Sequence, residues 1–316
     1  MLNNFSVAFY NLENLFDSEN NKYTLDQDFT SQGDLQWNED RYMRKIENLS
    51  KVISKIGIKN SNLPPVLLGV SEVENKKCLT DLINSKKLLP HSYDFVHYNS
   101  PDERGIDVAF LYQKKYFKLT YSDTYTLILT DENNMRDFTR DILLVSGKLF
   151  DEEVFIIVNH WPSRTKGMKF SDGKRVTAAK LVQEIVLDVQ KENENPHIII
   201  MGDFNDEPNS NSIKNYLMFD GVFNPMLSLK QKNRGTVKYQ GKWYMFDQII
   251  LSNSFQFGST KDMKFKKADI FDAYFLQEKS GKRKGAPKRT YIGKWHQGGY
   301  SDHFPVFVSF QKIIKL

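Results

Sequence analysis

Val66-Leu67-Leu68-Gly69-Val70 and Ile198-Ile199-Ile200-Met201 are two stretches in which every position is apolar. A strand of this composition is buried on both faces, so each stretch is predicted to lie in the centre of a sheet. Comparable runs, rich in β-branched and aromatic residues, span residues 5–11, 65–73, 93–98, 106–113, 117–129, 140–150, 152–161, 197–203, 236–252 and 304–310. About ten strands exceed one comfortable open sheet, so we predict two packed sheets.

Three helices are predicted among these strands. Asn38 can cap a helix whose apolar positions recur at spacings of four and three, and Gly57 can end it. The other two span residues 75–89 and 173–192, with apolar stripes that face the core. Helices outside two packed sheets would cover both faces of each sheet, which indicates an α/β fold. Because no internal repeat and no low-complexity linker divides the chain, we expect a single domain over residues 1–316.

The composition, with 40% hydrophobic and 26% charged residues in a chain of 316, is typical of a globular protein and excludes the disordered and fibrous classes. The 44 Lys and Arg against 39 Asp and Glu leave a net charge of +5, a mild excess that would help an anionic substrate to approach. Cys78 is the only cysteine, so no intrachain disulfide, thiolate zinc site or iron–sulfur cluster can form, and we expect this thiol in the core.

The sequence also bears on location and assembly. It contains no stretch of roughly 18 apolar residues and no basic leader with a long apolar run, so we expect no membrane span. The lack of disulfides favours the cytoplasm, and an exported form is the alternative if a signal peptide has been removed. We expect a monomer.

Polar residues gather at the ends of the predicted strands. The five segments concerned are Asn11-Leu12-Glu13-Asn14, Glu72-Val73-Glu74-Asn75, Asn159-His160-Trp161-Pro162, Asp203-Phe204-Asn205-Asp206-Glu207-Pro208 and Ser301-Asp302-His303. Singly, an Asn or Asp at a strand end is more often a turn former. However, Asp203 and Asn205 are two positions apart and project to one face, where they could hold a phosphate and its attacking water. Oxygen and nitrogen ligands without cysteine suit magnesium or manganese.

Together, these segments resemble a known enzyme superfamily. The motifs that carry the resemblance are Tyr10-Asn11-Leu12-Glu13-Asn14-Leu15-Phe16-Asp17, Ser71-Glu72-Val73, Arg104-Gly105-Ile106-Asp107-Val108-Ala109, Asn159-His160-Trp161-Pro162-Ser163-Arg164, Gly202-Asp203-Phe204-Asn205, Phe246-Asp247-Gln248 and Ser301-Asp302-His303. Over residues 5–310, in the right order, the chain resembles the endonuclease/exonuclease/phosphatase superfamily, most closely its bacterial branch. The resemblance implies a four-layer α/β/β/α sandwich, with two packed, mostly antiparallel sheets and outer helices. It further implies a phosphoric-ester hydrolase that depends on Mg or Mn.

The resemblance implies roles for individual residues on the metal side of the site. Glu72 would ligate the divalent cation, although Ser71 replaces the usual Gln before it. Asn11 would support the metal and the phosphate, and Asp302 would face the metal. Glu13 matches an acidic position that the apurinic endonucleases use.

On the catalytic side, the resemblance implies that Asp203 orients or deprotonates the attacking water and that Asn205 hydrogen-bonds the scissile phosphate. His303 would contact the phosphate and stabilise its charge, with Asp247 fixing the tautomer of the imidazole. His160 would be the second histidine of the site.

Two arginines are harder to interpret. Arg140 resembles the arginine that nucleases of this group place on the phosphate, although an exposed strand arginine is the alternative. Arg104 and Asp107 belong to a motif of the bacterial branch to which we assign no mechanistic role, and a local ion pair at a turn is the simpler interpretation.

Two basic stretches bear on the substrate. Residues 221–246 and 279–294 contain no acidic residue, and the second includes Lys282, Arg283 and Lys284. A charge run is usually a solvated loop, but basic loops beside a phosphodiesterase centre would follow a nucleic-acid backbone. We therefore expect a metal-dependent nuclease. The alternatives are a phosphatase or a phospholipid or inositol-phosphate phosphodiesterase on the same scaffold, and a catalytically silent binding protein, against which the complete set of site residues argues.

Overall fold

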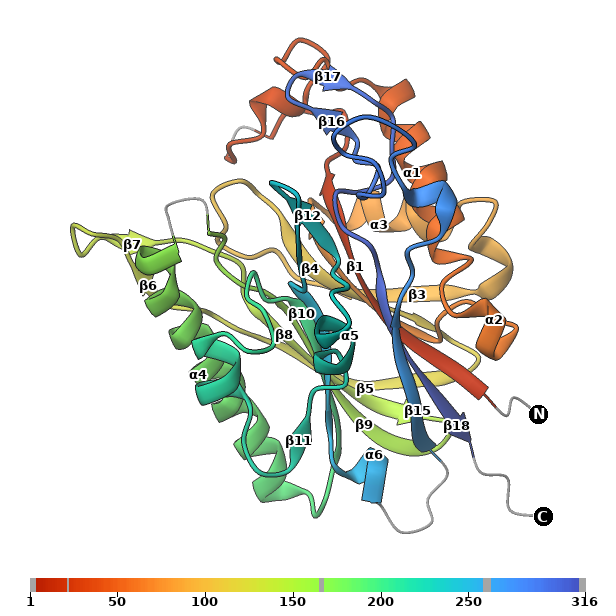
Figure 1. Cartoon of the computed structure of the whole chain (residues 1–316), viewed down its shortest axis with the longest axis vertical. Coiled ribbons are helices and arrows are strands. Elements are labelled where there is room, and N and C mark those ends of the chain that lie inside the picture. Colours follow the sequence, from red (N-terminus) through yellow and green to blue (C-terminus); the bar gives the residue numbers. More distant parts are fainter. Residues whose placement is uncertain (1–3, 22, 165–167, 258–262, 313–316) are drawn as a thin grey trace.

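Two six-stranded sheets pack face to face and form the centre of the molecule (Figure 1). The computed structural model describes residues 4–21, 23–164, 168–257 and 263–312. The first sheet has the order β15-β18-β1-β2-β4-β3 and the second the order β11-β14-β10-β9-β8-β5. Each sheet has one parallel pair, β1–β2 and β9–β10, while all its other pairs are antiparallel.

The strands of the first sheet are β1 (Asn4–Leu15), β2 (Leu67–Val73), β3 (Tyr93–His97), β4 (Asp107–Gln113), β15 (Met263–Ile270) and β18 (Val306–Lys312). The strands of the second sheet are β5 (Phe117–Tyr125), β8 (Ile142–Leu149), β9 (Glu152–His160), β10 (His197–Asp203), β11 (Val222–Phe223) and β14 (Asp247–Ser252). Three short hairpins complete the strands of the described residues: β6 (Leu129–Thr130) with β7 (Arg136–Asp137), β12 (Val237–Tyr239) with β13 (Lys242–Tyr244), and β16 (Tyr291–Ile292) with β17 (Trp295–His296).

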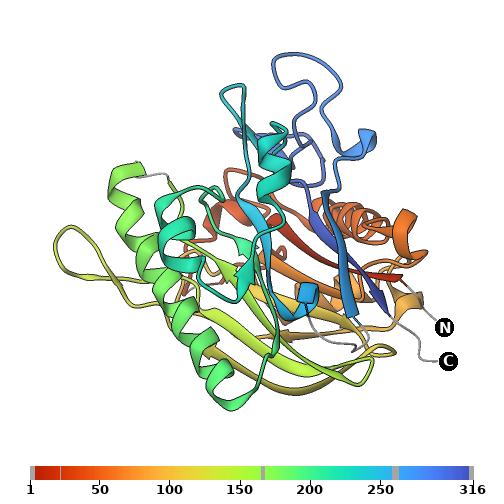
Figure 2. The same ribbon diagram turned by 60° about the horizontal axis from the view of Figure 1, so that its bottom comes forward.

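Helices cover the outer faces of the sandwich, as Figure 2 shows. The α-helices are α1 (Glu39–Ile53), α2 (Ile58–Ser61), α3 (Lys76–Ile83), α4 (Met168–Glu192), α5 (Leu227–Gln231) and α6 (Ser254–Phe257). Single turns of other helix types span Gln27–Phe29, Leu89–His91, Ser212–Leu217 and Tyr274–Leu276. α1, α2 and α3 lie along the first sheet, and the apolar side of α4 packs on the second.

The apolar strand β10 is covered on one face by the other sheet and on the opposite face by a helix. Ile199 and Met201 belong to the core between the sheets, whereas Ile198 and Ile200 pack with α4 in a second core. Successive side chains point to opposite faces of a strand, so both faces of β10 are buried. The predicted central position of this stretch and the four-layer sandwich are confirmed.

The sequence predicted most strands of the two large sheets and three of the helices, α1, α3 and α4. Asn38 caps α1, its Oδ1 accepting a hydrogen bond from Arg41 N at 3.1 Å. The helix expected over 75–89 ends at Ile83, and the run 236–252 divides into β12, β13 and β14. Two strands of the large sheets, β11 and β15, were not predicted. Among the described residues we find no helix with the length and apolar character of a membrane span.

The two central strands touch each other across the sandwich. A Cβ atom built on Gly69 of β2 would lie 2.5 Å from Met201 Sδ of β10 and 3.1 Å from Phe9 Cδ2 of β1. Glycine therefore allows the long Met201 side chain to lie over the first sheet. The contact joins the same two apolar stretches that predicted the two-sheet fold.

We predict that Gly69→Val lowers the free energy of unfolding by about 1–3 kcal/mol, because the added methyl groups overpack this contact. Met201→Ala should cost about 2–5 kcal/mol through the cavity it leaves. The double variant should lose less than the sum of the two single losses, since the valine occupies the space of the missing side chain. Urea unfolding of the three variants measures this coupling. Additive losses would mean that the two residues do not share a packing site.

Candidate active site

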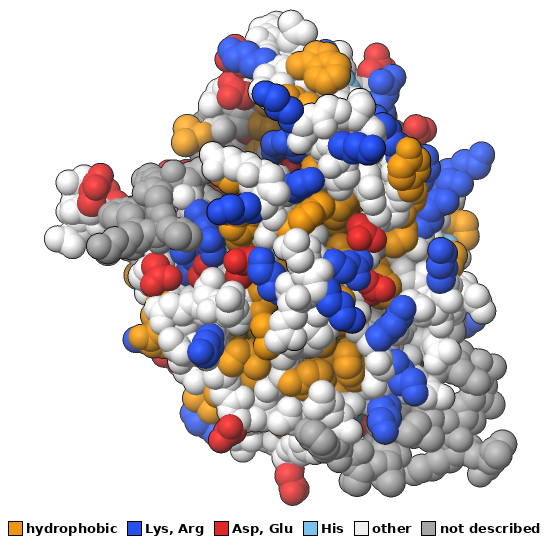
Figure 3. All heavy atoms as spheres, viewed as in Figure 1, with side chains coloured by type: hydrophobic (Ala, Val, Ile, Leu, Met, Phe, Trp, Pro, Cys, Tyr) orange, Lys and Arg blue, Asp and Glu red, His pale blue; other side chains and the backbone are white. Residues whose placement is uncertain are grey.

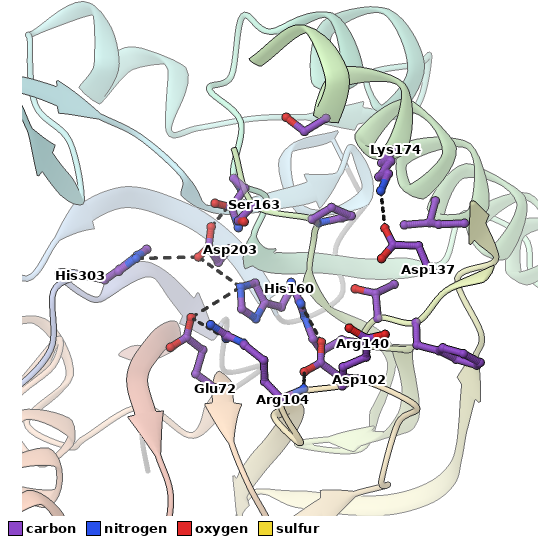
Figure 4. Close-up of a pocket in the computed structure, with 17 residues that line it drawn as sticks. Glu72, Asp102, Arg104, Asp137, Arg140, His160, Ser163, Lys174, Asp203 and His303 are labelled. Atoms are coloured by element: carbon purple, nitrogen blue, oxygen red, sulfur yellow. Dashed lines mark hydrogen bonds and ion pairs between the residues drawn. The ribbon is translucent and has the colours of Figure 1, made fainter. Parts of the chain in front are cut away.

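Four of the five polar segments at the strand ends contribute residues to one cavity of about 350 Å³, and the segment 11–14 lies beside it (Figure 4). Glu72, His160, Asp203, Asn205 and His303 all line it. The convergence follows from the topology, because the carboxyl ends of two parallel strands lie at the same edge of a sheet. Glu72 lies on β2 of the first sheet, and His160 and Asp203 end β9 and β10 of the second, where they are direct neighbours in register.

Irregular backbone aims several of these side chains. The register of β2 shifts against β4 between Ser71 and Val73, so Glu72 lies in a bulge, with a φ of 61°. Asn14 and Asn205 also have positive φ values, 52° and 48°. Non-glycine residues adopt this conformation at a cost, and bulges often redirect a side chain next to an active site.

Asn11 connects the two sheets at the cavity. Its Nδ2 donates to Asp203 Oδ2 at 3.0 Å and lies 3.4 Å from Glu72 Oε1. Its Oδ1 accepts from Glu13 N at 2.9 Å, which fixes the orientation of the amide. The second oxygen of Glu72, Oε2, accepts from Asn14 N at 2.8 Å. One amide therefore places the carboxylates of Glu72 and Asp203 beside each other.

Asp203 and His303 form the most strongly polarised part of the site. Burial raises the pKa of Asp203 to about 7, the nearby Asp247 carboxylate adds to the rise, and His303 opposes it. His303 Nδ1 lies 2.7 Å from Asp247 Oδ2, and its Nε2 lies 3.8 Å from Asp203 Oδ2. Burial by itself would lower the pKa of His303, but the carboxylates of Asp247 and Asp203 hold it well above its ordinary value. His303 is therefore held as an imidazolium.

His160 is the opposite case. Burial and the positive charges of Arg140 and Arg104 keep the pKa of His160 well below its ordinary value. Its Nε2 lies 3.8 Å from Glu72 Oε1 and 3.7 Å from Asp203 Oδ2. The cavity therefore holds one neutral and one charged imidazole, which can perform different tasks.

Asn205 lines the cavity two residues after the end of β10. Its backbone N–H donates to Asp203 Oδ1 at 2.9 Å, and its Nδ2 donates to Trp161 O at 3.0 Å. An amide nitrogen carries two hydrogens, so a second donor remains for a ligand in the cavity.

Glu13 and Asp302 belong to a charge network next to the cavity, in which Glu13 and Lys45 are buried and Asp302 and Arg289 are partly exposed. Glu13 accepts from Arg289 Nε at 3.2 Å and from Thr290 N at 2.6 Å, and it lies 3.7 Å from Lys45 Nζ. Arg289 also donates to Asp302 Oδ2 at 2.6 Å, while Asp302 Oδ1 lies 3.9 Å from His303 Nε2. The Glu13 carboxylate is therefore bound to Arg289 and Lys45. Oδ2 of Asp302 is bound to Arg289, and its Oδ1 faces His303.

The predicted substrate-binding residues differ in position. Arg140 lines the cavity, but its Nη1 donates to Asp102 Oδ2 at 2.8 Å and its Nη2 to Trp161 O at 3.0 Å. Lys282, Arg283 and Lys284 lie instead on a turn that touches the β12–β13 hairpin, where Lys238 Nζ donates to Lys284 O at 3.2 Å. They are not among the residues that line the cavity.

Several residues that line the cavity were not predicted from the sequence. These are Asp102, Glu103, Arg104, Leu129, Asp137, Phe138, Thr139, Pro162, Ser163, Ser171 and Lys174. For three of them a signal existed: Arg104 begins the motif that runs to Ala109, and Pro162 and Ser163 belong to the motif that begins at Asn159. Lys174 of α4 forms an ion pair with Asp137 at the end of the cavity away from His303 (Figure 4).

The donor set fits a hard divalent cation. Among the residues that the structure describes, the contacts of Glu72 Oε1 with Asn11, Arg104 and His160 are all 3.4 Å or longer, so this oxygen is open to a ligand. Oxygen atoms in an acidic, partly buried pocket are what magnesium and manganese prefer. Ligand atoms of Asp203, Asp247 and His303 also lie within 4.8 Å of one another, but an imidazolium has no lone pair for a metal, so Glu72 is the better ligand.

Comparisons with known proteins agree with this geometry. A family model described as "Endonuclease/Exonuclease/phosphatase family" matches residues 6–312. Truncated TDP2 from Caenorhabditis elegans is 17% identical, with 98% of this chain and 97% of that chain covered and a TM-score of 0.60. A family protein from Bacteroides thetaiotaomicron is 16% identical over 100% of both chains, with a TM-score of 0.59.

A third solved structure is D. rerio TDP2 complexed with a single-strand DNA product, which is 15% identical over 98% of this chain and 99% of that chain, with a TM-score of 0.58. No curated protein matches the sequence significantly. At these identities the solved structures show that the fold is shared. The match of the family model over nearly the whole length shows that this chain belongs to the endonuclease/exonuclease/phosphatase family.

Proposed function

We propose that this protein is a divalent-metal-dependent phosphodiesterase that cleaves nucleic acid by in-line attack of water. The observation that carries the proposal is the convergence of Glu72, Asp203 and the His303–Asp247 pair in one cavity. Members of the family are phosphoric-ester hydrolases, which gives the reaction class. The roles of the individual side chains follow from their contacts.

Phosphodiester hydrolysis makes three demands on a site. The anionic ester repels hydroxide, so its charge must be neutralised, a water must be aligned opposite the leaving oxygen, and that oxygen must be stabilised as it departs. Glu72 is the residue that would hold the cation, with Asp302 facing it and with Asn11 supporting Glu72 through its Nδ2; the bound cation supplies charge neutralisation. Glu13 is not included, because its carboxylate is committed to Arg289, Thr290 and Lys45.

Asp203 and Asn205 would align the water and the phosphate. With its pKa raised to about 7 by burial, Asp203 can accept a proton from water near neutral pH. Asn11 and the Asn205 backbone hold the two carboxylate oxygens, so the attacking water would be positioned in one place. The second amide hydrogen of Asn205 is available to the scissile phosphate.

The two histidines would act on the phosphate in different protonation states. His303, held as a cation by Asp247, would stabilise the negative charge that develops in the transition state. His160, held neutral by burial, would donate a single hydrogen bond from a fixed position beside Glu72.

A nucleic-acid substrate is supported by the charge on the surface. Figure 3 shows Lys and Arg side chains across one face, including the part that carries the β12–β13 and β16–β17 hairpins. Lys282, Arg283 and Lys284 lie on the turn next to β12, where Lys284 O accepts from Lys238 Nζ at 3.2 Å, and clusters of this charge bind phosphate backbones. The D. rerio TDP2 structure that shares this fold holds a single-strand DNA product. The polynucleotide backbone would then extend from the cavity over this surface.

The proposal predicts hydrolysis of single-stranded or duplex DNA, or RNA, in the presence of Mg²⁺ or Mn²⁺, and no hydrolysis in excess chelator. Glu72→Gln should lower kcat by at least ~100-fold, because it removes a charged oxygen from the cation site. Glu47→Gln, on the exposed face of α1, is the matched control and should be unchanged. The measurement is a panel that also includes a phosphomonoester, an inositol phosphate and sphingomyelin.

Each outcome of the panel decides between the candidate functions. Cleavage of only the phosphomonoester, or of only a lipid or inositol phosphate, would replace the nuclease by the corresponding activity. Full turnover in chelator would contradict metal dependence. No turnover of any substrate by a folded protein would favour a binding role.

A second prediction concerns pH. If the His303 cation is the active form, kcat/KM should fall as pH rises through the pKa of His303. Asp247→Asn removes the charge that raises this pKa, so the falling limb should move to lower pH. The pH profile, together with NMR titration of His303, measures the shift, and Asp220→Asn at an exposed position is the control. A falling limb that stays in place in Asp247→Asn would contradict the role of the pair.

A further inference from the structure

Arg104 reaches the cavity from the turn between β3 and β4. It lines the cavity, its side chain is 49% exposed, and its Nη2 lies 3.9 Å from Glu72 Oε1. Figure 4 shows the guanidinium directed toward the Glu72 carboxylate, next to His160. Within the described part of the chain, the Arg104 guanidinium has this long ion pair and no hydrogen bond. Its donors are therefore available to a ligand at the centre of the cavity.

The turn that carries Arg104 is held at both of its ends. Asp107, at the start of β4, accepts from Ser100 N at 2.9 Å and from His97 Nε2 at 3.1 Å. Asp102 accepts from Arg104 N at 3.0 Å through Oδ1, and its backbone oxygen accepts from Gly105 N, also at 3.0 Å. These bonds fix the direction in which the Arg104 side chain leaves the turn.

A glycine lets the turn pack against a neighbouring segment. Gly105 has a φ of +70°, and a Cβ atom there would lie 2.5 Å from Thr24 Cγ2. Next to this contact, Leu25 N donates to Glu103 O at 2.8 Å. The motif from Arg104 to Asp107 is thus explained by its geometry: Asp107 and Gly105 build a rigid turn, and Arg104 is the side chain that the turn presents.

Arg140 differs from Arg104 in its surroundings. Its side chain is only 11% exposed, and it donates to Asp102 Oδ2 at 2.8 Å and Trp161 O at 3.0 Å. Both terminal nitrogens therefore already have partners within the protein. Asp102 is the same residue whose other oxygen holds the backbone of Arg104. Arg140 consequently supports the turn that presents Arg104.

We propose that Arg104, and not Arg140, is the arginine that contacts the substrate phosphate, and that Arg140 is a positioning residue that acts through Asp102. The proposal rests on the proposed function, because it assigns a phosphate group to this cavity. A guanidinium presents paired donors that match two phosphate oxygens, which the Arg104 position allows and the Arg140 position does not.

The test is chemical rescue by free guanidinium ion. Arg104→Ala should lower kcat/KM for a phosphodiester by about 10- to 100-fold, the scale for loss of a hydrogen bond to a charged group. Millimolar guanidinium should restore part of this activity, because the vacated position is half exposed and opens into the cavity. Arg140→Ala should also lose activity, but without rescue, since its position is buried. Arg44→Ala, on the exposed face of α1, is the control.

A second readout does not need turnover. In chelator, inorganic phosphate should raise the unfolding temperature of the wild type and of Arg44→Ala but not that of Arg104→Ala, and Arg104→Lys should show a smaller rise. Wild-type kcat/KM and phosphate stabilisation in Arg104→Ala would overturn the proposal, even if Glu72→Gln is inactive. Guanidinium rescue of Arg140→Ala alone would also overturn it. If the wild type hydrolyses nothing, the proposed function fails while the phosphate experiment still tests Arg104.

Discussion

The hydrogen bond from Asn11 Nδ2 to Asp203 Oδ2, 3.0 Å long, crosses from one sheet to the other where the sandwich opens into the cavity. It can form only because β1–β2 and β9–β10 are parallel pairs whose carboxyl ends meet at the same end of the two sheets. Everything in the site depends on this alignment. Glu72 comes from the first sheet, His160 and Asp203 come from the second, and His303 precedes β18, which pairs with β1. The contact between Gly69 and Met201 maintains the same alignment in the apolar interior.

Burial gives the polar groups of the site properties that they would not have in water. Desolvation raises the pKa of Asp203 and lowers that of His160, while paired carboxylates hold His303 as a cation. Such a cluster is costly unless every charge has a partner, which accounts for the network around Asp302 and Arg289. The positive φ of Glu72 has a similar cost. A strained backbone conformation of this kind persists only where the surrounding structure holds it in place. The site therefore lowers the stability of the folded protein, but it keeps the charged groups in a fixed arrangement.

Much of this could be predicted from the sequence because it depends on local pattern. The fully apolar runs at 66–70 and 198–201 required two covered sheets, and polar residues at strand ends marked the site. What could not be predicted depends on contacts between distant residues. The bond between Glu13 and Arg289 joins positions 276 apart, and it draws Glu13 away from the cavity. β15 lies at the edge of its sheet, where it pairs with β18, and it carries three lysines. Edge strands often carry such charges, so β15 does not have the apolar pattern by which the central strands were predicted. The sequence does not show which of Arg140 and Arg104 is free to contact a ligand. Their contacts in the folded protein distinguish them.

The central claim is that this cavity hydrolyses a phosphodiester by direct attack of a water that Asp203 positions. The stereochemical course at phosphorus tests it most directly. A diastereomerically pure phosphorothioate diester would be hydrolysed in ¹⁸O-labelled water, and the configuration of the product would be determined by NMR. A single in-line displacement inverts the configuration at phosphorus, and inversion is the predicted result. Retention would require a covalent phosphoryl-enzyme intermediate, with Asp203 or a histidine as the nucleophile, and would contradict the account.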